Sequence, residues 1–158
     1  MKNRWIIVGV AGVSVLLGGA GTAAHSYNPI KWIKKGPGPT ASEQLAANKQ
    51  EEKKLSLQLQ AVLPARTSLR DACAGFKSLD DCVAALHVSH NLKIKFNCLK
   101  WDVTGAKPAG DVKSCAAPSK DKALDLSKAI RELKPDANSR TEAKIAEKRA
   151  REDIKDAS

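Results

Sequence analysis

The sequence predicts a mainly α-helical protein: a small helical domain pinned by disulfides, behind an N-terminal signal or transmembrane segment and followed by a solvated C-terminal helix. Hydrophobic residues make up 42% of the 158 residues and aromatic residues only 4%. Ala and Leu therefore supply most of the apolar surface, which favours helices over a β-sandwich. All four cysteines lie within residues 67–115. A core of about fifty residues is too small to be secure without covalent cross-links.

Residues 1–24 have the pattern of an export signal or a membrane anchor. Two basic residues open the chain, and residues 5–24 carry no charge and end in Thr-Ala-Ala, which a signal peptidase can cleave. The same stretch is long enough for a membrane helix, and Tyr27 and Trp32 would lie at the interface after it. Cleavage is the preferred interpretation and anchoring stays open. Both predict export, either to the periplasm or medium, or to the cytoplasmic membrane with the C-terminal domain outside.

Residues 25–39 are expected to form a linker, because glycine and proline alternate at its end and cannot hold a helix. A capping box at residues 40–43 then opens a helix that runs to Leu63, before a proline. The leucines between positions 55 and 59 also alternate as they would in a strand. Leu, Gln and Lys favour the helix, and no turn signal flanks the run.

The cysteine module at residues 67–115 is predicted to contain three helices. They are expected from Thr67 or Ser68 to Gly75, from Ser78 to Leu92, and from Asn97 to Val103 before Gly105. The central helix has one face with helical spacing, made of Leu79, Cys82, Val83, Leu86 and His90. The small core is expected to be anchored by the three aromatic residues of the module, Phe76, Phe96 and Trp101.

Two more helices follow a loop at residues 106–119. The first is expected to begin at Ser119 or Asp121 and to end before Pro135. Its apolar face consists of Leu126, Ala129, Ile130 and Leu133. The second begins at a capping box, residues 139–142, and reaches the C-terminus.

The C-terminal segment, residues 136–158, is expected to be a solvated charged helix outside the helical domain at residues 40–135. Charged residues spaced by four support it on the surface, and its apolar contacts are few, namely Ile145, Ala146, Ala150 and Ile154. Its deletion is therefore expected to leave the fold intact.

The four cysteines are expected to form two disulfides, because an exported chain meets an oxidising compartment and the count is even. Three connectivities are possible. The preferred pairing is Cys73–Cys82 with Cys98–Cys115, since each closes a short loop between neighbouring elements. A thiol oxidoreductase usually carries Cys-x-x-Cys, which the sequence lacks.

His87 and His90 are the alternative metal-binding pair, because residues at i and i+3 lie on one side of a helix. Cys82 does not join them easily, since it lies five residues before His87 and nearly opposite on the helix. No metal is assigned in the preferred interpretation. Both histidines are expected to be bystanders to the fold.

No catalytic residue and no cofactor are assigned. The residue types of a hydrolase triad occur near His87, with Ser89, Asp80 and Asp81, but one short helix cannot arrange them around a substrate. The sequence contains no phosphate-binding glycine loop, no His-Glu-x-x-His and no Gly-x-Ser-x-Gly. These observations argue against an enzyme.

The formal net charge of +10 raises the question of a nucleic-acid partner. The basic residues are spread along the chain, and no basic stripe is interleaved with aromatic residues. A nucleic-acid partner is therefore not expected. The expected partners are the membrane, if the N-terminal segment is uncleaved, and an unidentified protein or envelope component.

Several stretches together resemble small exported bacterial proteins of unassigned function. They are residues 28–35 (NPIKWIKK), 40–46 (TASEQLA), 75–77 (GFK) and 86–92 (LHVSHNL). The resemblance implies an exported helical protein and no activity. It also implies that Cys82, Cys98 and Cys115 are a stabilising elaboration, because they are not a fixed feature of that group.

The sequence thus predicts an exported, non-enzymatic helical protein with a binding or envelope-structural role. The first alternative is a metal-binding module that uses His87 and His90. The second is a small periplasmic enzyme.

Overall fold

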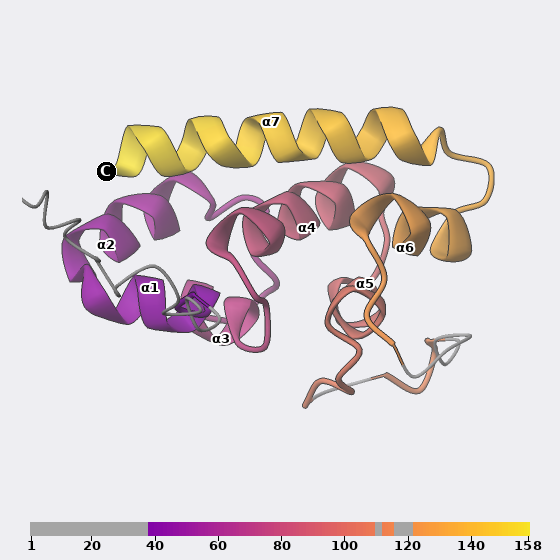
Figure 1. Cartoon of the computed structure of the whole chain (residues 1–158), viewed down its shortest axis with the longest axis horizontal. Coiled ribbons are helices and arrows are strands. Elements are labelled where there is room, and N and C mark those ends of the chain that lie inside the picture. The colour runs from indigo at the N-terminus through magenta and orange to yellow at the C-terminus, as the bar shows by residue number, and fades with distance from the viewer. Residues whose placement is uncertain (1–37, 110–111, 116–121) are drawn as a thin grey trace, which may run out of the picture. The chain divides into compact units, whose positions relative to one another are not determined.

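The computed structural model describes residues 38–109, 112–115 and 122–158. The predictions of an export signal at residues 1–24 and of most of the linker lie outside this part. Within it the chain forms seven α-helices and no strand, which confirms the mainly α-helical fold class (Figure 1). Among these residues no helix combines the length and the hydropathy needed to span a bilayer.

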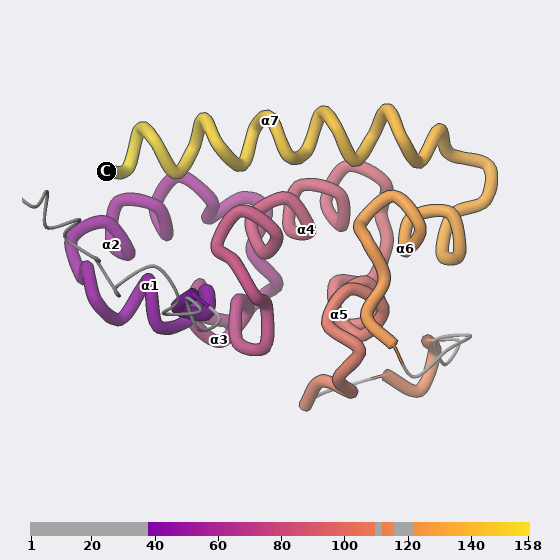
Figure 2. Tube along the Cα trace, viewed as in Figure 1, coloured from indigo at the N-terminus to yellow at the C-terminus, as the bar shows by residue number. Residues whose placement is uncertain are grey.

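The helices surround α4, which is the centre of the packed structure. In chain order they are α1 (Ala41–Ala47), α2 (Lys49–Gln58), α3 (Leu69–Cys73), α4 (Leu79–Leu92), α5 (Phe96–Thr104), α6 (Leu126–Leu133) and α7 (Ser139–Ala157). Helix α4 contacts α1, α3, α5, α6 and α7, and Figure 2 shows the chain passing around it. Residues 82–88 are consequently all buried, as expected of a helix with neighbours on several sides.

The predicted single helix over residues 40–63 is wrong: the chain forms two helices, and the second ends at Gln58 and not at Leu63. The capping box is present, since the Thr40 side chain accepts from the Glu43 N–H and the Glu43 carboxylate accepts from the Thr40 N–H. Asn48 breaks the helix with φ −129° and ψ 87°, and its side chain accepts from the N–H of Glu51 to start α2. Asparagine competes with the helical backbone in this way. The leucines at positions 55 and 57 are helical, as predicted.

The starts of α3 and α4 follow the sequence prediction, whereas the start of α5 does not. Ser68 and Ser78 each accept from a backbone N–H three residues later, at 3.1 Å. Asn97 was expected to cap α5, but it lies inside the helix, and Lys95 occupies the cap position with no side-chain hydrogen bond. Gly105 ends α5 with φ +71°, a conformation that glycine adopts without steric cost.

The starts of α6 and α7 also differ from the prediction. Asp125, and not Ser119 or Asp121, caps α6 by accepting from the N–H of Lys128 at 2.9 Å. Asn138 caps α7, one residue before the predicted Ser139. In both helices a side-chain oxygen that directly precedes the first turn satisfies its free N–H groups.

Helix α7 is not a solvated helix, and this overturns the prediction for residues 136–158. It runs along α4 and shares its most extensive helix–helix contact with it (Figure 1). The buried residues of α7 are Ala143, Ala146, Ala150 and Ala157. These small side chains let the two helices approach closely, so a face whose fully buried residues are alanines belongs to the core, with Ile154 half-buried against it.

Two core assignments also change. His90 is exposed, although its spacing placed it on the buried face of α4, and His87 is buried with 9% of its surface exposed. Phe76 and Phe96 are buried and stack with ring centroids 6.2 Å apart. Trp101 is only half-buried, and the ammonium of Lys107 lies 5.6 Å from its ring centroid.

Candidate functional site

Two disulfides hold the cysteine module, with the preferred connectivity. Cys73–Cys82 joins α3 to α4 with Cα atoms 5.3 Å apart, and Cys98–Cys115 joins α5 to residues 112–115 with Cα atoms 5.2 Å apart. The first pair is fully buried. Two such bonds indicate that the domain folds in an oxidising environment.

A groove of about 730 Å³ lies between α3 and α5, within the range of about 300–1,000 Å³ that is common for ligand sites. The chain between α2 and α3 and the loop after α5 complete its walls. The lining residues used below are Pro64, Asp71, Ala72, Phe96, Lys100 and Pro108. Cys73–Cys82 holds α3 on α4, and Cys98–Cys115 ties the loop after α5 back to α5.

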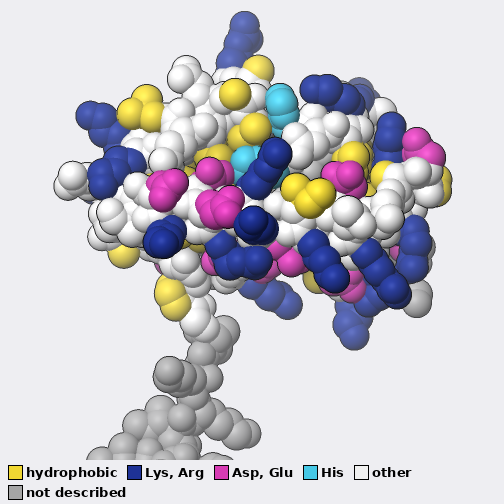
Figure 3. All heavy atoms as spheres, turned by 90° about the horizontal axis from the view of Figure 1, so that it is seen from above, with side chains coloured by type: hydrophobic (Ala, Val, Ile, Leu, Met, Phe, Trp, Pro, Cys, Tyr) yellow, Lys and Arg dark blue, Asp and Glu magenta, His cyan; other side chains and the backbone are white. Residues whose placement is uncertain are grey.

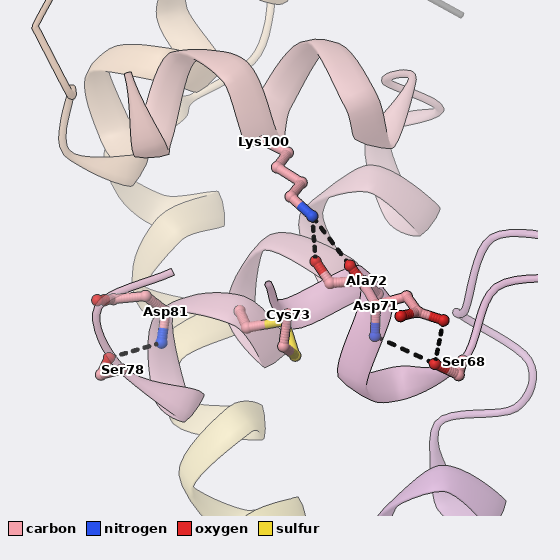
Figure 4. The surroundings of a disulfide bond; sticks show 8 residues. Ser68, Asp71, Ala72, Cys73, Ser78, Asp81 and Lys100 are labelled. Carbon is pink, nitrogen blue, oxygen red and sulfur yellow. Dashed lines mark hydrogen bonds between the residues drawn. A yellow bond between two sulfur atoms is a disulfide. The ribbon is translucent and has the colours of Figure 1, made fainter. Parts of the chain in front are cut away.

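Lys100 is the central charged residue of the groove. Its side chain reaches from α5 toward α3, where Nζ donates to the carbonyl oxygens of Asp71 at 3.0 Å and Ala72 at 2.9 Å (Figure 4). These carbonyls belong to the C-terminal end of α3, which carries partial negative charge. The same ammonium lies 6.0 Å from the centroid of the Phe76 ring. Burial lowers the pKa of Lys100, and the charge of Asp71 opposes this effect.

The Asp71 carboxylate is directed away from Lys100. It accepts from the Ser68 hydroxyl at 2.6 Å, and the Ser68 hydroxyl in turn accepts from the Asp71 N–H (Figure 4). The carboxylate is therefore part of the cap of α3. It does not form an ion pair with the ammonium in the groove.

Asp102 is a buried acid on the opposite side of α5 from Lys100, because residues two apart on a helix point in nearly opposite directions. Only 2% of Asp102 is exposed. Burial, followed by the negative charge of Glu132, raises the pKa of Asp102 to about 6. Its carbonyl accepts from the N–H of Leu124 at 2.8 Å, which holds the segment before α6 against α5.

The two histidines lie in different surroundings. His87 Nε2 lies 2.6 Å from Oδ2 of Asp153, so this pair links α4 to α7. His90 is exposed on the surface. No group of three or more metal-ligating side chains occurs in the described part of the chain. His87 has a structural partner, so the prediction that both histidines are bystanders to the fold is not supported for this residue.

The surface charge is mixed on the face that Figure 3 shows, where Lys and Arg side chains alternate with Asp and Glu. The basic residues are therefore distributed over this face as they are distributed along the sequence. This face offers no continuous basic track of the kind that follows a phosphate backbone.

Sequence reasoning did not single out Lys100 or Asp102, although a signal for each was present. Lys100 lies four residues after Phe96 and three before Val103, so a charge interrupts the apolar side of the helix. Asp102 lies three residues after Leu99, inside the buried side. The signal in each case is a charged residue at an apolar position of a short helix, where burial of the charge is costly.

The comparisons with known proteins add no family. No protein-family model, no curated protein and no solved structure matches the chain.

Proposed function

We propose that this chain is an exported, non-enzymatic helical binding protein whose ligand site is the groove between α3 and α5. The observation that carries the proposal is a groove of ligand size whose two long walls each carry one cysteine of a disulfide. Cys73–Cys82 holds α3 on the central helix, and Cys98–Cys115 holds the chain beyond the groove on α5. A preformed concave surface loses little conformational entropy on binding, so more of the contact energy appears as affinity.

The proposed location is outside the cytoplasm, with the signal at residues 1–24 either cleaved or retained as an anchor. The charged start and uncharged run of this segment support export. The two disulfides support an oxidising compartment. Retention of the segment would make the membrane a second partner.

The alternatives have weaker support. A metal site at His87 and His90 has weaker support because His87 is buried, His90 is exposed, and the described residues contain no group of three or more metal-ligating side chains. A small enzyme needs a base or nucleophile near a substrate cavity. Lys100 lines the groove, but its ammonium is engaged by two carbonyl oxygens.

A test is to screen small ligands by NMR against the oxidised full-length protein and to map the amide shifts. We expect hits to perturb residues at the groove, Ala72 and Phe96 among them. Ala106→Trp should remove these hits, because Ala106 is exposed and lines the groove. The matched control is Ala61→Trp, at an exposed position that does not line it. Hits that cluster elsewhere, or that survive Ala106→Trp, would contradict the proposal.

A further inference from the structure

The charge of Lys100 is only partly satisfied within the groove. An ammonium has three N–H donors. Two of them go to the carbonyl oxygens of Asp71 and Ala72. Among the described residues no hydrogen bond uses the third donor, and no carboxylate forms an ion pair with the ammonium. The groove thus contains a partly buried positive charge with one donor available to a ligand.

The other charged residues of the groove leave this positive charge dominant. Lys107 adds a second cation, which lies over the Trp101 ring at the edge of the groove. Asp71 is the acidic residue of the lining, and its carboxylate is bound to the Ser68 hydroxyl. An anionic ligand therefore meets two cations and one carboxylate that is already hydrogen-bonded.

Part of the remaining lining is apolar and adjoins Lys100, while Thr67, Asn97 and Thr104 are polar. Phe96 lies one helical turn before Lys100 and stacks on Phe76, and Pro64, Ala72 and Pro108 add apolar surface. A groove that combines this apolar surface with fixed polar groups at Lys100 suits a ligand of the same character, with an apolar body and one polar end.

We infer that the α3–α5 groove binds a small molecule with an apolar body and a single carboxylate, and that Lys100 receives the carboxylate. This inference rests on the proposed function and specifies its ligand class. The carboxylate accepts from the third N–H of Lys100 in a charge-assisted hydrogen bond, which is stronger than a bond to a neutral acceptor.

The same geometry favours a carboxylate over a phosphate. A phosphate carries more negative charge and needs several donors, usually supplied by arginine or by the N-terminus of a helix. Here the ammonium sits at the C-terminal end of α3, and the partial negative charge of its carbonyls opposes a dianion. One available donor and a nearby helix C-terminus suit a monoanion.

The test compares three probes of the same apolar body: 3-phenylpropionate, its neutral primary amide, and 2-phenylethylphosphonate. Each is titrated by NMR into the oxidised full-length protein at pH 7.5, with the groove amides as the readout. We expect the carboxylate to bind at least about tenfold more tightly than the amide, as one charge-assisted hydrogen bond implies. The phosphonate should bind more weakly than the carboxylate.

The variant Lys100→Met keeps a side chain of similar length and removes the charge. It should lower the affinity for 3-phenylpropionate to the affinity for its amide. Lys155→Met, at an exposed position on α7, should leave the preference for the carboxylate unchanged. If Lys100→Met does not fold, Lys107→Met provides the second variant, and it should weaken the carboxylate without affecting the amide.

The failures of the two proposals are distinguishable. Equal affinity of the amide and the carboxylate at the groove would overturn the inference about Lys100 and leave the binding site in place. A phosphonate that binds more tightly than the carboxylate would overturn the assignment of ligand class. Absence of groove shifts with all three probes would count against the proposed function itself.

Discussion

Lys100 and Asp102 are charged side chains two positions apart on α5, and the helix directs them to different environments. Lys100 reaches the groove and finds two carbonyl oxygens. Asp102 points into the packed side of the helix, where 2% of the residue is exposed and no cation pairs with it among the described residues. A buried carboxylate without a cation costs free energy in its charged form. Asp102 is therefore a weak point of the fold at neutral pH.

Asp102→Asn is expected to stabilise the protein at pH 7.5. The pKa of Asp102 is raised from 3.8 to about 6, so the folded chain holds this proton more tightly than the unfolded chain does. The stability that this tighter proton binding gives the folded chain is fully present below pH 3.8 and is lost as the pH rises through about 6. The gain from Asn at pH 7.5 is at most about 3 kcal/mol. Urea unfolding of both proteins between pH 4 and pH 8 measures it.

The difference between wild type and Asp102→Asn should shrink toward zero as the pH falls to 4. Glu132→Gln is the matched comparison, because it removes the smaller of the two causes and leaves the burial. It should stabilise the protein at pH 7.5 by less than Asp102→Asn. An Asn variant that is less stable than wild type at pH 7.5 would show that the ionised carboxylate is favourable in place.

His87→Ala is expected to destabilise the protein by about 2–3 kcal/mol, while His90→Ala should change stability by no more than about 0.5 kcal/mol. His87 contributes a buried ring and a contact of 2.6 Å with Asp153, whereas His90 is exposed. The two positions lie three residues apart on α4, so each serves as the control for the other. Urea unfolding at pH 7.5 provides the measurement.

A double-mutant cycle with Asp153→Ala tests whether the cost at His87 comes from the contact between α4 and α7. The two substitutions should be non-additive, because removal of either partner already breaks the same hydrogen bond. Strict additivity, or equal losses for His87→Ala and His90→Ala, would contradict the structural role of His87.

At the scale of elements, α7 shows how small residues build an interface. Its buried face consists of four alanines, while Ile145 on the same helix is 42% exposed. The sequence prediction counted Ala146 and Ala150 with the two isoleucines and judged these apolar residues too few to bury the helix. The stripe at positions 143, 146, 150 and 157 has helical spacing, so the periodicity was visible. The surface of α4 that this stripe contacts was not visible in the sequence, because the contact joins distant parts of the chain.

The difference between signals close together in the sequence and contacts between distant parts of the chain also separates several predicted features from missed ones. Ser68 and Ser78 were identified as caps because each binds a backbone group three residues later in the sequence. The start of α5 has no side-chain cap and coincides with the packing of Phe96 on Phe76, which sequence spacing does not reveal. The groove depends on contacts such as that between Lys100 and Asp71, 29 residues apart. Local capping was therefore predictable at α3 and α4, although it was missed at Asn48, Asp125 and Asn138, and the groove was not predictable.

Ala150→Leu is expected to destabilise the protein by about 1–3 kcal/mol, because Ala150 is fully buried in the α7 interface and a larger side chain overpacks it. Arg149→Leu is the control, at the exposed neighbouring position, and should have little effect. Chemical denaturation measures both.

Deletion of residues 136–158 should abolish the cooperative unfolding transition, since it uncovers α4. A truncated chain that still unfolds cooperatively would restore the view of α7 as an appendage.

At the scale of the whole domain, the two disulfides differ in burial. Cys73 and Cys82 are both fully buried, whereas Cys98 is 6% exposed and Cys115 is half-buried at the end of the loop after α5. The pairs are separated by 9 and 17 residues in sequence, and loop entropy assigns about 3 kcal/mol to each. Their contributions to stability are thus similar, while their accessibility to a reductant is not.

Graded reduction of the folded protein is therefore expected to proceed in two steps. A mild thiol reductant should open Cys98–Cys115 first, because attack requires access to a sulfur atom. Cys73–Cys82 should open only when the domain unfolds, with loss of the helical circular dichroism signal. Alkylation of the freed thiols, followed by peptide mass spectrometry, identifies which pair has opened at each reductant concentration.

Two double variants provide the controls for this order. Cys98→Ser with Cys115→Ser should remain folded and keep its remaining disulfide closed under the mild condition. Cys73→Ser with Cys82→Ser should lose about 2–5 kcal/mol of stability and bring the opening of Cys98–Cys115 and unfolding to nearly the same reductant concentration. If the buried pair in wild type is alkylated first while the helical signal persists, the packing of α3 against α4 does not protect it. The α3 wall of the groove would then not be held in place by its disulfide.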